Sequence, residues 1–523
     1  MENETVFWAD SIAKKLIADF PGEQVVQDEK TPSGRIHLGS LRGFVLHQIL
    51  FDALKDAGAK ARFLLGSDDY DELDKIPAYW KDKVSEKWLG APLCNVPSPS
   101  GNHSSYAEEV RSEVYEHFDD LGLSPELYNT SDKYKDGTFN EATKTALENA
   151  EKINEINRKV SGADKKSGHL PFKPICPSCG KINTSFASDF DGKTVAFECK
   201  EYKGCNEKGR ISPYDGKGKL PWKVEWAAKW KAFQVTCEYA GKDHFTKGGS
   251  HDVSVEIAKQ VYNLKPPYGE GYEFVLLGKK KMSSSGGVGE TAADILKKFS
   301  PKMIRFLFVK SRPSFQLPFD PSGQEVPRLF DEYDKIERVY FGLEKESNER
   351  EVKHLKRVYE LSHAGKLPAK TTQVNFSFAT ALVQVAKGKE KNVLQKLGHL
   401  PKQLDAEEEK LTEQRLKDAK NWVEHYAPED FKINVLKDIP KVDLSEKEKE
   451  LFLLTASKLT DGIQDEELQN FFYNTCKEKG LNVKEAFGKV YALFLGKNRG
   501  PRLGPFLSSL EKDFAVKRLK LEN

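Results

Sequence analysis

The chain has 523 residues, of which 31% are charged and 38% are hydrophobic, with 82 basic side chains against 80 acidic ones. A formal charge of +2 excludes a uniformly basic coat for nucleic acid but leaves room for local basic surfaces. At roughly 150 residues per domain this length predicts about three domains. No apolar run approaches the ~20 residues of a membrane span and the N-terminus lacks signal-peptide features, so we expect a cytosolic protein.

A strand, a helix and a second strand are predicted in succession near the N-terminus. The strands cover residues 24–26 and 61–65, and apolar residues at helical spacing predict the helix over 37–57. Such a unit favours a parallel sheet, in which ligands lie beyond the carboxyl ends of the strands. The turn at 31–34 and the acidic pair at 68–69 follow the two strands, so both are candidates for a binding site.

The rest of the chain predicts further elements of both kinds. An amphipathic helix is expected over residues 142–160, and a cysteine-bearing segment of about 40 residues follows a glycine-bounded break at 162–168. Sheet-like sequence resumes at 222–233 and 273–277. From about residue 331 onward, Lys, Glu, Leu and Ala with helical periodicity predict a separate all-α domain. The expected fold class is α/β with a parallel sheet, followed by an all-α domain.

Two short segments carry chemistry suited to a nucleotide. The first is Thr31-Pro-Ser-Gly-Arg-Ile-His-Leu-Gly-Ser40, in which Gly34 permits a tight turn and Gly39 lets a flat group approach the helix backbone. The helix N-terminus offers free amides and a positive dipole to phosphate, and His37 adds a donor there. The second is Lys279-Lys-Lys-Met-Ser-Ser-Ser-Gly-Gly287, whose ammonium and hydroxyl groups suit a polyphosphate. Taken singly, each segment is more often a plain loop.

Together these segments resemble the signature motifs of class I aminoacyl-tRNA synthetases. His37-Leu-Gly-Ser40 is similar to the first motif, and Lys281-Met-Ser-Ser-Ser285 is similar to the second. Segments along essentially the whole chain resemble the class I lysyl-tRNA synthetases in particular: Phe7-Trp-Ala-Asp10, Asp68-Asp-Tyr-Asp71, Trp222-Lys-Val-Glu-Trp226, Gly241-Lys-Asp-His244, Lys247-Gly-Gly-Ser250 and Gly500-Pro-Arg-Leu-Gly504. No Gly-x-Gly-x-x-Gly fingerprint follows a strand, in agreement with a family that binds ATP and not NAD.

The resemblance implies a domain plan and a reaction. It implies a Rossmann-type catalytic domain over residues 1–330, with an insertion at about 95–220, and an α-helical anticodon-binding domain over 331–523. Lysine would be activated with ATP and Mg²⁺ to lysyl-adenylate and then transferred to tRNA. His37 and Lys281 would be catalytic. The ATP-binding residues would be Pro32, Ser33, Gly34, His37, Gly39, Ser40, Lys281, Met282, Ser283, Ser284 and Ser285.

A lysine pocket needs acidic or aromatic groups for the ε-ammonium and hydrogen bonds for the α-amino and carboxylate groups. The motifs bring six candidates near the strand ends: Thr31, Asp68, Asp69, Trp222, Glu225 and His244. The chain departs from the family pattern at Ser40, at Ser284 and at Gly43, where many relatives have a carboxylate. The acid that meets the ε-ammonium is therefore left open.

Two other functions are compatible with parts of the pattern. Glutamyl-tRNA synthetases resemble this family, but they place an arginine ahead of the Pro-Ser turn, where this chain has Gln27-Asp28-Glu29-Lys30. A non-catalytic, zinc-containing RNA-binding protein derived from a synthetase would be expected to lose one signature motif. Intact His37 and Lys281 argue against this second alternative.

Four cysteines have the spacing of a metal site. Cys176 and Cys179 form a Cys-x-x-Cys pair, and 19 and 5 intervening residues lead to Cys199 and Cys205. This spacing is typical of a four-thiolate zinc site, although the second pair is wider than usual. With no open ligand position the zinc would be structural, in a module over residues 172–212. A redox pair or untied cysteines are the alternatives.

A basic loop near the C-terminus is the candidate for RNA contact. Lys497, Arg499 and Arg502 lie in a glycine- and proline-rich stretch, where arginine could contact phosphates or stack on unpaired bases of tRNA. A helix-to-helix turn with solvated charges explains the same residues equally well. The sequence does not fix the oligomeric state; we expect a monomer.

Overall fold

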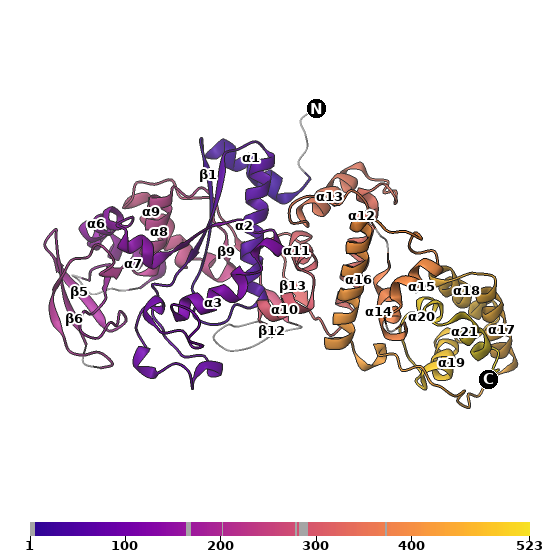
Figure 1. The fold of residues 1–523 in the computed structure, drawn as a ribbon. Helices are drawn as coiled ribbons and strands as arrows, with labels where there is room; N and C mark the ends of the chain where they lie inside the picture. The colour runs from indigo at the N-terminus through magenta and orange to yellow at the C-terminus, as the bar shows by residue number, and fades with distance from the viewer. Residues whose placement is uncertain are drawn as a thin grey trace. The chain divides into compact units, whose positions relative to one another are not determined.

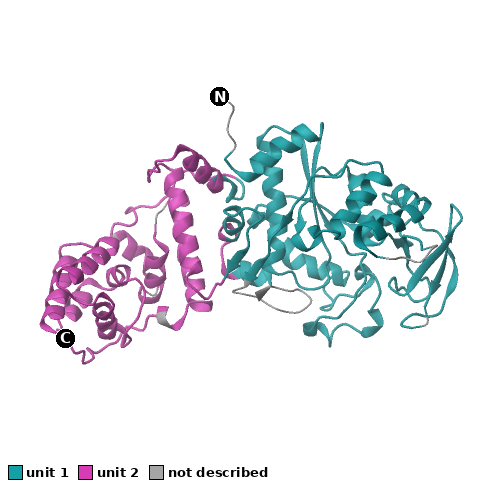
Figure 2. Ribbon diagram, turned by 180° about the vertical axis from the view of Figure 1, so that it is seen from behind, with its two compact units in different colours: residues 1–297, 304–319, 360–365 teal, residues 298–303, 320–359, 366–523 magenta. Residues whose placement is uncertain are grey.

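A computed structural model describes residues 6–163, 169–200, 202–277, 280–281, 291–371, 374–386 and 388–522. The chain divides into two compact units (Figure 2): unit 1 comprises residues 1–297, 304–319 and 360–365, and unit 2 comprises 298–303, 320–359 and 366–523. None of the helices in the described ranges is long and apolar enough to cross a membrane.

A parallel sheet forms the centre of unit 1. Strands β1 (Gln24–Lys30), β2 (Ala61–Ser67) and β3 (Glu126–Asn129) pair in that order, all in parallel. Parallel bridges from Val26 to Cys237 and from Cys237 to Tyr268 extend the layer beyond β1. The prediction of a strand–helix–strand unit with a parallel sheet is confirmed, and β1 is longer than the predicted segment at 24–26.

Helices cover both faces of this sheet (Figure 1). On one face, Phe63 of β2 packs against His47 and Phe51 of helix α2 (Leu38–Asp56). On the other face, Val25 and Leu64 belong to a core shared with helices α6 to α9. Alternation of side chains along a strand places neighbouring residues of β1 on opposite faces. The remaining helices up to residue 309 are α1 (Trp8–Asp19), α3 (Tyr106–Tyr115), α4 (Phe118–Leu121), α5 (Thr130–Lys135), α6 (Asn140–Glu148), α7 (Ala150–Ser161), α8 (Trp222–Phe233), α9 (Ser250–Gln260), α10 (Ala292–Lys298) and α11 (Pro301–Val309).

Two secondary-structure predictions need correction. Residues 222–233, predicted to be sheet-like, form helix α8, with Pro221 at its N-cap. Seven consecutive residues of α8, 224–230, are buried, so its apolar side chains do not follow a one-sided helical period. The helix predicted over 142–160 is two helices, because Asn149 leaves helical geometry between α6 and α7.

Smaller sheets complete unit 1. Strands β9 (Ala240–Gly241) and β10 (Gly271–Tyr272) pair in parallel, and β11 (Val275–Leu277) lies between β12 (Lys280–Lys281) and β13 (Leu317–Phe319). The cysteine-bearing segment forms β4 (Lys173–Pro174) paired with β8 (Gly218–Lys219), and an antiparallel sheet of β5 (Ser185–Phe190), β6 (Val195–Cys199) and β7 (Lys208–Ile211). Short 3₁₀ turns of unit 1 lie at Ala78–Trp80, Glu86–Trp88, Leu93–Asn95 and Lys242–Phe245, and one in unit 2 lies at Glu429–Phe431.

After β13 the described chain contains helices and no strand. The helices are α12 (Glu325–Tyr340), α13 (Glu349–Leu361), α14 (Phe376–Val385), α15 (Glu390–Lys396), α16 (Ala406–His425), α17 (Glu446–Thr460), α18 (Asp465–Glu478), α19 (Val483–Leu495), α20 (Leu503–Ser509) and α21 (Lys512–Leu519). Phe452, Phe472, Phe494 and Phe506 lie at the centre of one core that α17 to α21 share. Composition placed the change to helical sequence at about residue 331. Helix α12 begins a few residues earlier, at Glu325.

Candidate active site

A cavity of about 1000 Å³ lies in unit 1 at the carboxyl ends of β1 and β2. This is the edge at which an open parallel sheet binds its ligands. The wall includes ends of both strands, the start of α2, the start of α8 and the segments around β9 and β10. Its lining includes Asp28, Glu29, Lys30, Thr31, Ser33, Ser40, Asp68, Asp71, Glu72, Lys219, Trp222, Trp226, Glu238, Tyr239, His244 and Tyr272.

The first motif forms the entry into α2. His37 is the N-cap residue and α2 begins at Leu38. The His37 ring folds over Gly39: a Cβ atom at position 39 would lie 3.0 Å from two of its ring atoms. A side chain larger than hydrogen at position 39 would therefore displace the imidazole. Ser33 and Ser40 line the cavity, and Pro32 and Gly34 are buried in the turn that joins β1 to α2.

The backbone on either side of the second motif lies beside the first. Strand β12, which contains Lys281, pairs with β11, and Val275 of β11 approaches within 3.9 Å of a Cβ placed on Gly39. Thr291 forms an antiparallel bridge with His37, and the Ala292 amide donates to the Ile36 carbonyl at 2.8 Å. The backbone of Lys281 is described but its side chain is not, and Met282, Ser283, Ser284 and Ser285 lie outside the described residues.

A buried lysine, Lys229 of α8, neutralises two carboxylates that line the cavity. Its Nζ atom lies 2.9 Å from Glu29 and 2.5 Å from Asp68, and the side chain is 1% exposed. Burial disfavours the charged lysine, but these carboxylates outweigh it and hold the pKa of Lys229 well above its ordinary value. Thr130 donates a further hydrogen bond to Asp68 at 3.0 Å.

A second buried lysine, Lys219, does the same for another pair of acids. Its Nζ atom lies 2.5 Å from Asp71 and 2.9 Å from Glu225. Despite burial, the ion pair with Lys219 holds the pKa of Asp71 below its usual value. Thr31 donates to Asp71 at 3.0 Å, so this residue of the first motif is tied to the charged network.

The six candidates for amino-acid binding fall into two groups. Thr31, Asp68, Trp222 and His244 line the cavity, and the last two form an aromatic wall in which the Trp222 ring stacks on Trp226 at 4.9 Å and meets His244 edge-on at 5.1 Å. Asp69 and Glu225 are absent from the lining formed by the described residues. Asp69 accepts hydrogen bonds from the amide and hydroxyl of Ser131, and Glu225 accepts one from the Tyr134 hydroxyl at 2.8 Å.

Several residues in the cavity wall or directly behind it were not singled out by the sequence. Lys219 and Lys229 meet carboxylates up to 200 residues away, and Glu238 and Tyr272 come from segments without a motif. Asp28 lies within residues 27–30, whose acidic character as a group distinguishes the chain from the glutamyl enzymes. Proximity in space, and no local pattern, identifies these residues.

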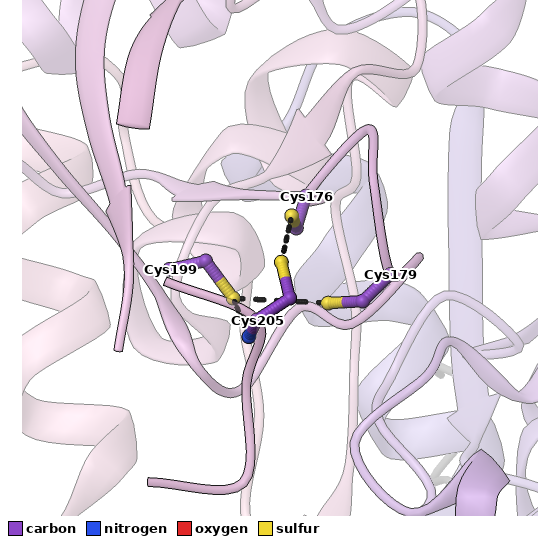
Figure 3. A group of neighbouring side chains, drawn as sticks. All are labelled: Cys176, Cys179, Cys199 and Cys205. Carbon is purple, nitrogen blue, oxygen red and sulfur yellow. Dashed lines mark hydrogen bonds between the residues drawn. The ribbon is translucent and has the colours of Figure 1, made fainter. Parts of the chain in front are cut away.

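The four cysteines of the predicted metal site come together (Figure 3). Their sulfur atoms all lie within 4.8 Å of one another, with 3.5 Å between Cys176 and Cys205 and 3.7 Å between Cys179 and Cys199. Four thiolates around a tetrahedral zinc, each about 2.3 Å from the metal, would be about 3.8 Å apart. The donor set and its spacing fit such an ion, so this cluster could hold a metal.

The three basic residues considered for RNA contact lie in unit 2. Lys497 donates to the backbone carbonyls of Glu429 and Lys432, at 2.9 and 3.4 Å, and Arg502 pairs with Glu466 at 2.6 Å. Arg499 lies between them, just before α20. Lys497 is thus engaged in holding its own loop.

Known proteins with related sequences match this chain over nearly its whole length. A model of the family described as tRNA synthetases class I (K) matches residues 6–365. Proteins named lysine--tRNA ligase match at 36% identity in Pyrococcus horikoshii, 37% in Thermococcus kodakarensis and 35% in Methanocaldococcus jannaschii. These matches cover 98–99% of this chain and 99–100% of each relative. The chain therefore belongs to the class I tRNA synthetases of the K family.

Proposed function

We propose that this protein is a lysine--tRNA ligase, which activates L-lysine with ATP and transfers it to the 3′ end of tRNA. Full-length similarity to relatives that carry this name supports the activity. The single structural observation that carries the proposal is the meeting of the two signature regions. His37 and Gly39 lie beside Val275 and Thr291, which flank the second motif, at the sheet edge where the cavity opens.

The first half-reaction forms lysyl-adenylate. A carboxylate oxygen of lysine attacks the α-phosphorus of ATP, and the bond to the bridging oxygen breaks to release pyrophosphate. His37, Lys281 and the amides around Gly39 stabilise the charge that develops on the phosphates. Residues 32–34, Ser40 and 282–285 complete the ATP site. Bound Mg²⁺ would supply further neutralisation of the triphosphate.

The second half-reaction transfers lysine to RNA. A ribose hydroxyl at the 3′ end of tRNA attacks the carbonyl carbon of the adenylate, and AMP leaves. Unit 2 supplies the surface for the anticodon end, with Arg499 and Arg502 as the candidate contacts. In this plan the sheet domain is the Rossmann-type catalytic domain and the helices after residue 330 are the anticodon-binding domain.

The cavity supplies the amino-acid site, with Thr31, Asp68, Trp222 and His244 in its wall. The lining carries more acids than bases, which suits a substrate with a cationic side chain better than glutamate. Asp69 and Glu225 support this wall through Ser131 and Lys219. We assign the four-cysteine cluster to a structural zinc, held by Cys176, Cys179, Cys199 and Cys205. Location in the cytosol and a monomeric state stay predictions of the sequence.

Amino-acid-dependent ATP–pyrophosphate exchange tests the function directly. It is run with each of the twenty amino acids, with tRNA present because some synthetases need it for activation. Exchange with lysine alone is the expected result. Exchange with glutamate alone would move the protein to the glutamyl type, and the absence of exchange with every amino acid would leave a non-catalytic RNA-binding protein.

A further inference from the structure

The carboxylates of the cavity wall are not all neutralised in the same way. Glu29 and Asp68 share Lys229, Asp71 pairs with Lys219, and Glu72 pairs with Lys173 at 2.7 Å. Each of these acids already has an ammonium partner from the protein. Asp74 and Asp243 also line the cavity but are exposed. The two buried acids of the lining, Asp28 and Glu238, form no ion pair with a lysine or arginine among the described side chains.

Asp28 lies on the α2 face of β1, next to a histidine. His47 Nδ1 lies 3.3 Å from Asp28 Oδ2 and 2.8 Å from the Gly43 carbonyl. The backbone amide of Tyr239 donates to His47 Nε2 at 2.9 Å, so Nε2 is an acceptor and the ring proton belongs on Nδ1. A second proton on Nε2 would oppose this amide. Despite burial, Asp28 raises the pKa of His47, but the Tyr239 amide occupies Nε2. His47 is thus a neutral donor, with its Nδ1 proton shared between the Gly43 carbonyl and Asp28, and the carboxylate keeps its negative charge.

Gly43 leaves open the space above the second turn of α2 where this carboxylate lies. A Cβ atom at position 43 would come within 2.9 Å of Asp28 Oδ2 and within 2.8 Å of the Tyr272 hydroxyl oxygen. Two oxygen atoms from separate strands thus converge over a backbone position without a side chain. Burial raises the pKa of the Tyr272 phenol, which stays neutral at physiological pH and can accept a hydrogen bond.

We infer that Asp28 is the specificity-determining carboxylate for the substrate's side chain, and that it receives the ε-ammonium of lysine together with the Tyr272 hydroxyl. This inference rests on the proposed function and names the acid that the sequence left open. An ammonium group brings three donors and one positive charge. Asp28 supplies a charge and an acceptor, and Tyr272 supplies a second acceptor and an aromatic ring.

Glu238 is the competing acid. Its carboxylate accepts a hydrogen bond from Trp230 Nε1 at 2.5 Å. Trp230 belongs to the core on the α8 face of the sheet, opposite the face where His47 and Gly43 meet Asp28. Glu238 is thus held by a helix on the other side of β1, and it is not among the atoms that face the Gly43 opening.

The test compares three single-charge variants of the full-length protein: Asp28→Asn, Glu238→Gln and, as a matched control, Asp119→Asn on the exposed surface of α4. Pyrophosphate exchange is measured with lysine and with norleucine, which has the same carbon chain without the terminal amine. The ratio of the two kcat/KM values is taken on one preparation. It does not depend on the fraction of protein that is folded.

Asp28→Asn is expected to lower the preference for lysine over norleucine by at least about 30-fold, because a buried charge pair loses one partner. KM for ATP should stay within about 3-fold of wild type, since the lost contact is to the side chain of the amino acid. Asp119→Asn should match wild type in both measurements.

Two results would overturn the inference. One is an unchanged lysine-to-norleucine ratio in Asp28→Asn. The other is a large loss of this ratio in Glu238→Gln alone, which would assign the ammonium to the α8 face. Neither result would touch the proposed function, because wild type would still exchange with lysine; failure of wild type itself to use lysine would instead remove the proposed function.

Discussion

At the scale of single residues, ion pairing determines which carboxylates of the cavity wall keep an unneutralised charge. Lys219 and Lys229 are 2% and 1% exposed and contact four acids between them: Glu29, Asp68, Asp71 and Glu225. Burying an ion is costly unless it is paired and hydrogen-bonded, so these contacts also stabilise the strand ends. Specificity then rests on the acids that the lysines leave available.

Replacing Lys229 should destabilise the protein strongly. Lys229→Met leaves Glu29 and Asp68 buried without their ammonium, which costs about 3–5 kcal/mol. Urea unfolding of unit 1 measures the change. Lys259→Met, which breaks a surface pair with Glu256, is the matched control and should cost less than about 1 kcal/mol. A loss of less than about 1 kcal/mol in Lys229→Met as well would contradict a buried ionic network.

The Glu238 carboxyl predicts a pH dependence of stability. Burial raises its pKa to about 7 in the folded state, while hydrogen bonds from Trp230 and Trp226 oppose this rise and the negative charge of Asp28 adds to it. The unfolded chain releases this proton near the ordinary value of about 4.3, so between that pH and 7 the folded state alone retains it. Stability should therefore fall as pH rises through this window, by up to about 3 kcal/mol.

Urea unfolding at pH 5 and at pH 8 measures this fall. Glu238→Gln keeps an acceptor for Trp230 but cannot ionise, so its difference in unfolding free energy between the two pH values should be smaller than that of wild type by the same amount. An equal pH dependence in both proteins would show that another group is responsible.

At the scale of elements, short structures hold the chemistry in place. Arg42 of α2 donates to the backbone carbonyls of Glu273, Arg312, Pro313 and Phe315, at 2.5 to 3.2 Å. These contacts tie the segments before β11 and β13 to the helix that begins at the first motif. The alignment of the two signature regions thus depends on a buried guanidinium as well as on strand pairing.

The cysteine cluster belongs to the same scale. Wild type is expected to carry one zinc ion per chain, and Cys176→Ser should lose it because three thiolates bind more weakly than four. Zinc content and limited proteolysis over residues 172–212 measure the effect, with faster cleavage expected in the variant. Cys94→Ser lies outside the cluster and should retain the metal. Zinc retained by Cys176→Ser at wild-type level would contradict the assignment.

At the scale of the whole molecule, the proposal places both chemical steps in unit 1 and the binding of the anticodon end of tRNA in unit 2. Arg499→Ala in unit 2 should raise KM for tRNA in aminoacylation by about 10-fold, the effect of one lost phosphate or stacking contact. Lysine-dependent pyrophosphate exchange at saturating tRNA should stay unchanged, because the proposed site of adenylate formation lies in unit 1. Exchange and aminoacylation kinetics on the same preparation separate the two effects. An unchanged KM for tRNA would exclude Arg499 as a contact.

The sequence predicted the large features because they depend on neighbouring residues. Short apolar runs, helical spacing and turn residues predicted the unit of β1, α2 and β2, and cysteine spacing indicated a cluster that the fold assembles. The prediction of sheet at residues 222–233 was wrong because helix α8 is buried around its circumference. The one-sided spacing of apolar residues that indicates a helix is therefore missing.

By itself the sequence determined the family, the signature segments and the first strand–helix–strand unit, since each depends on residue types at fixed local spacing. Only the tertiary structure decided which acids remain available to a substrate. Glu29 pairs with Lys229, which is 200 residues away in the sequence. The packing of β1 against α2 places the Asp28 carboxylate above Gly43. Charge pairing in a buried site depends on distances between remote side chains, and no local pattern encodes those distances.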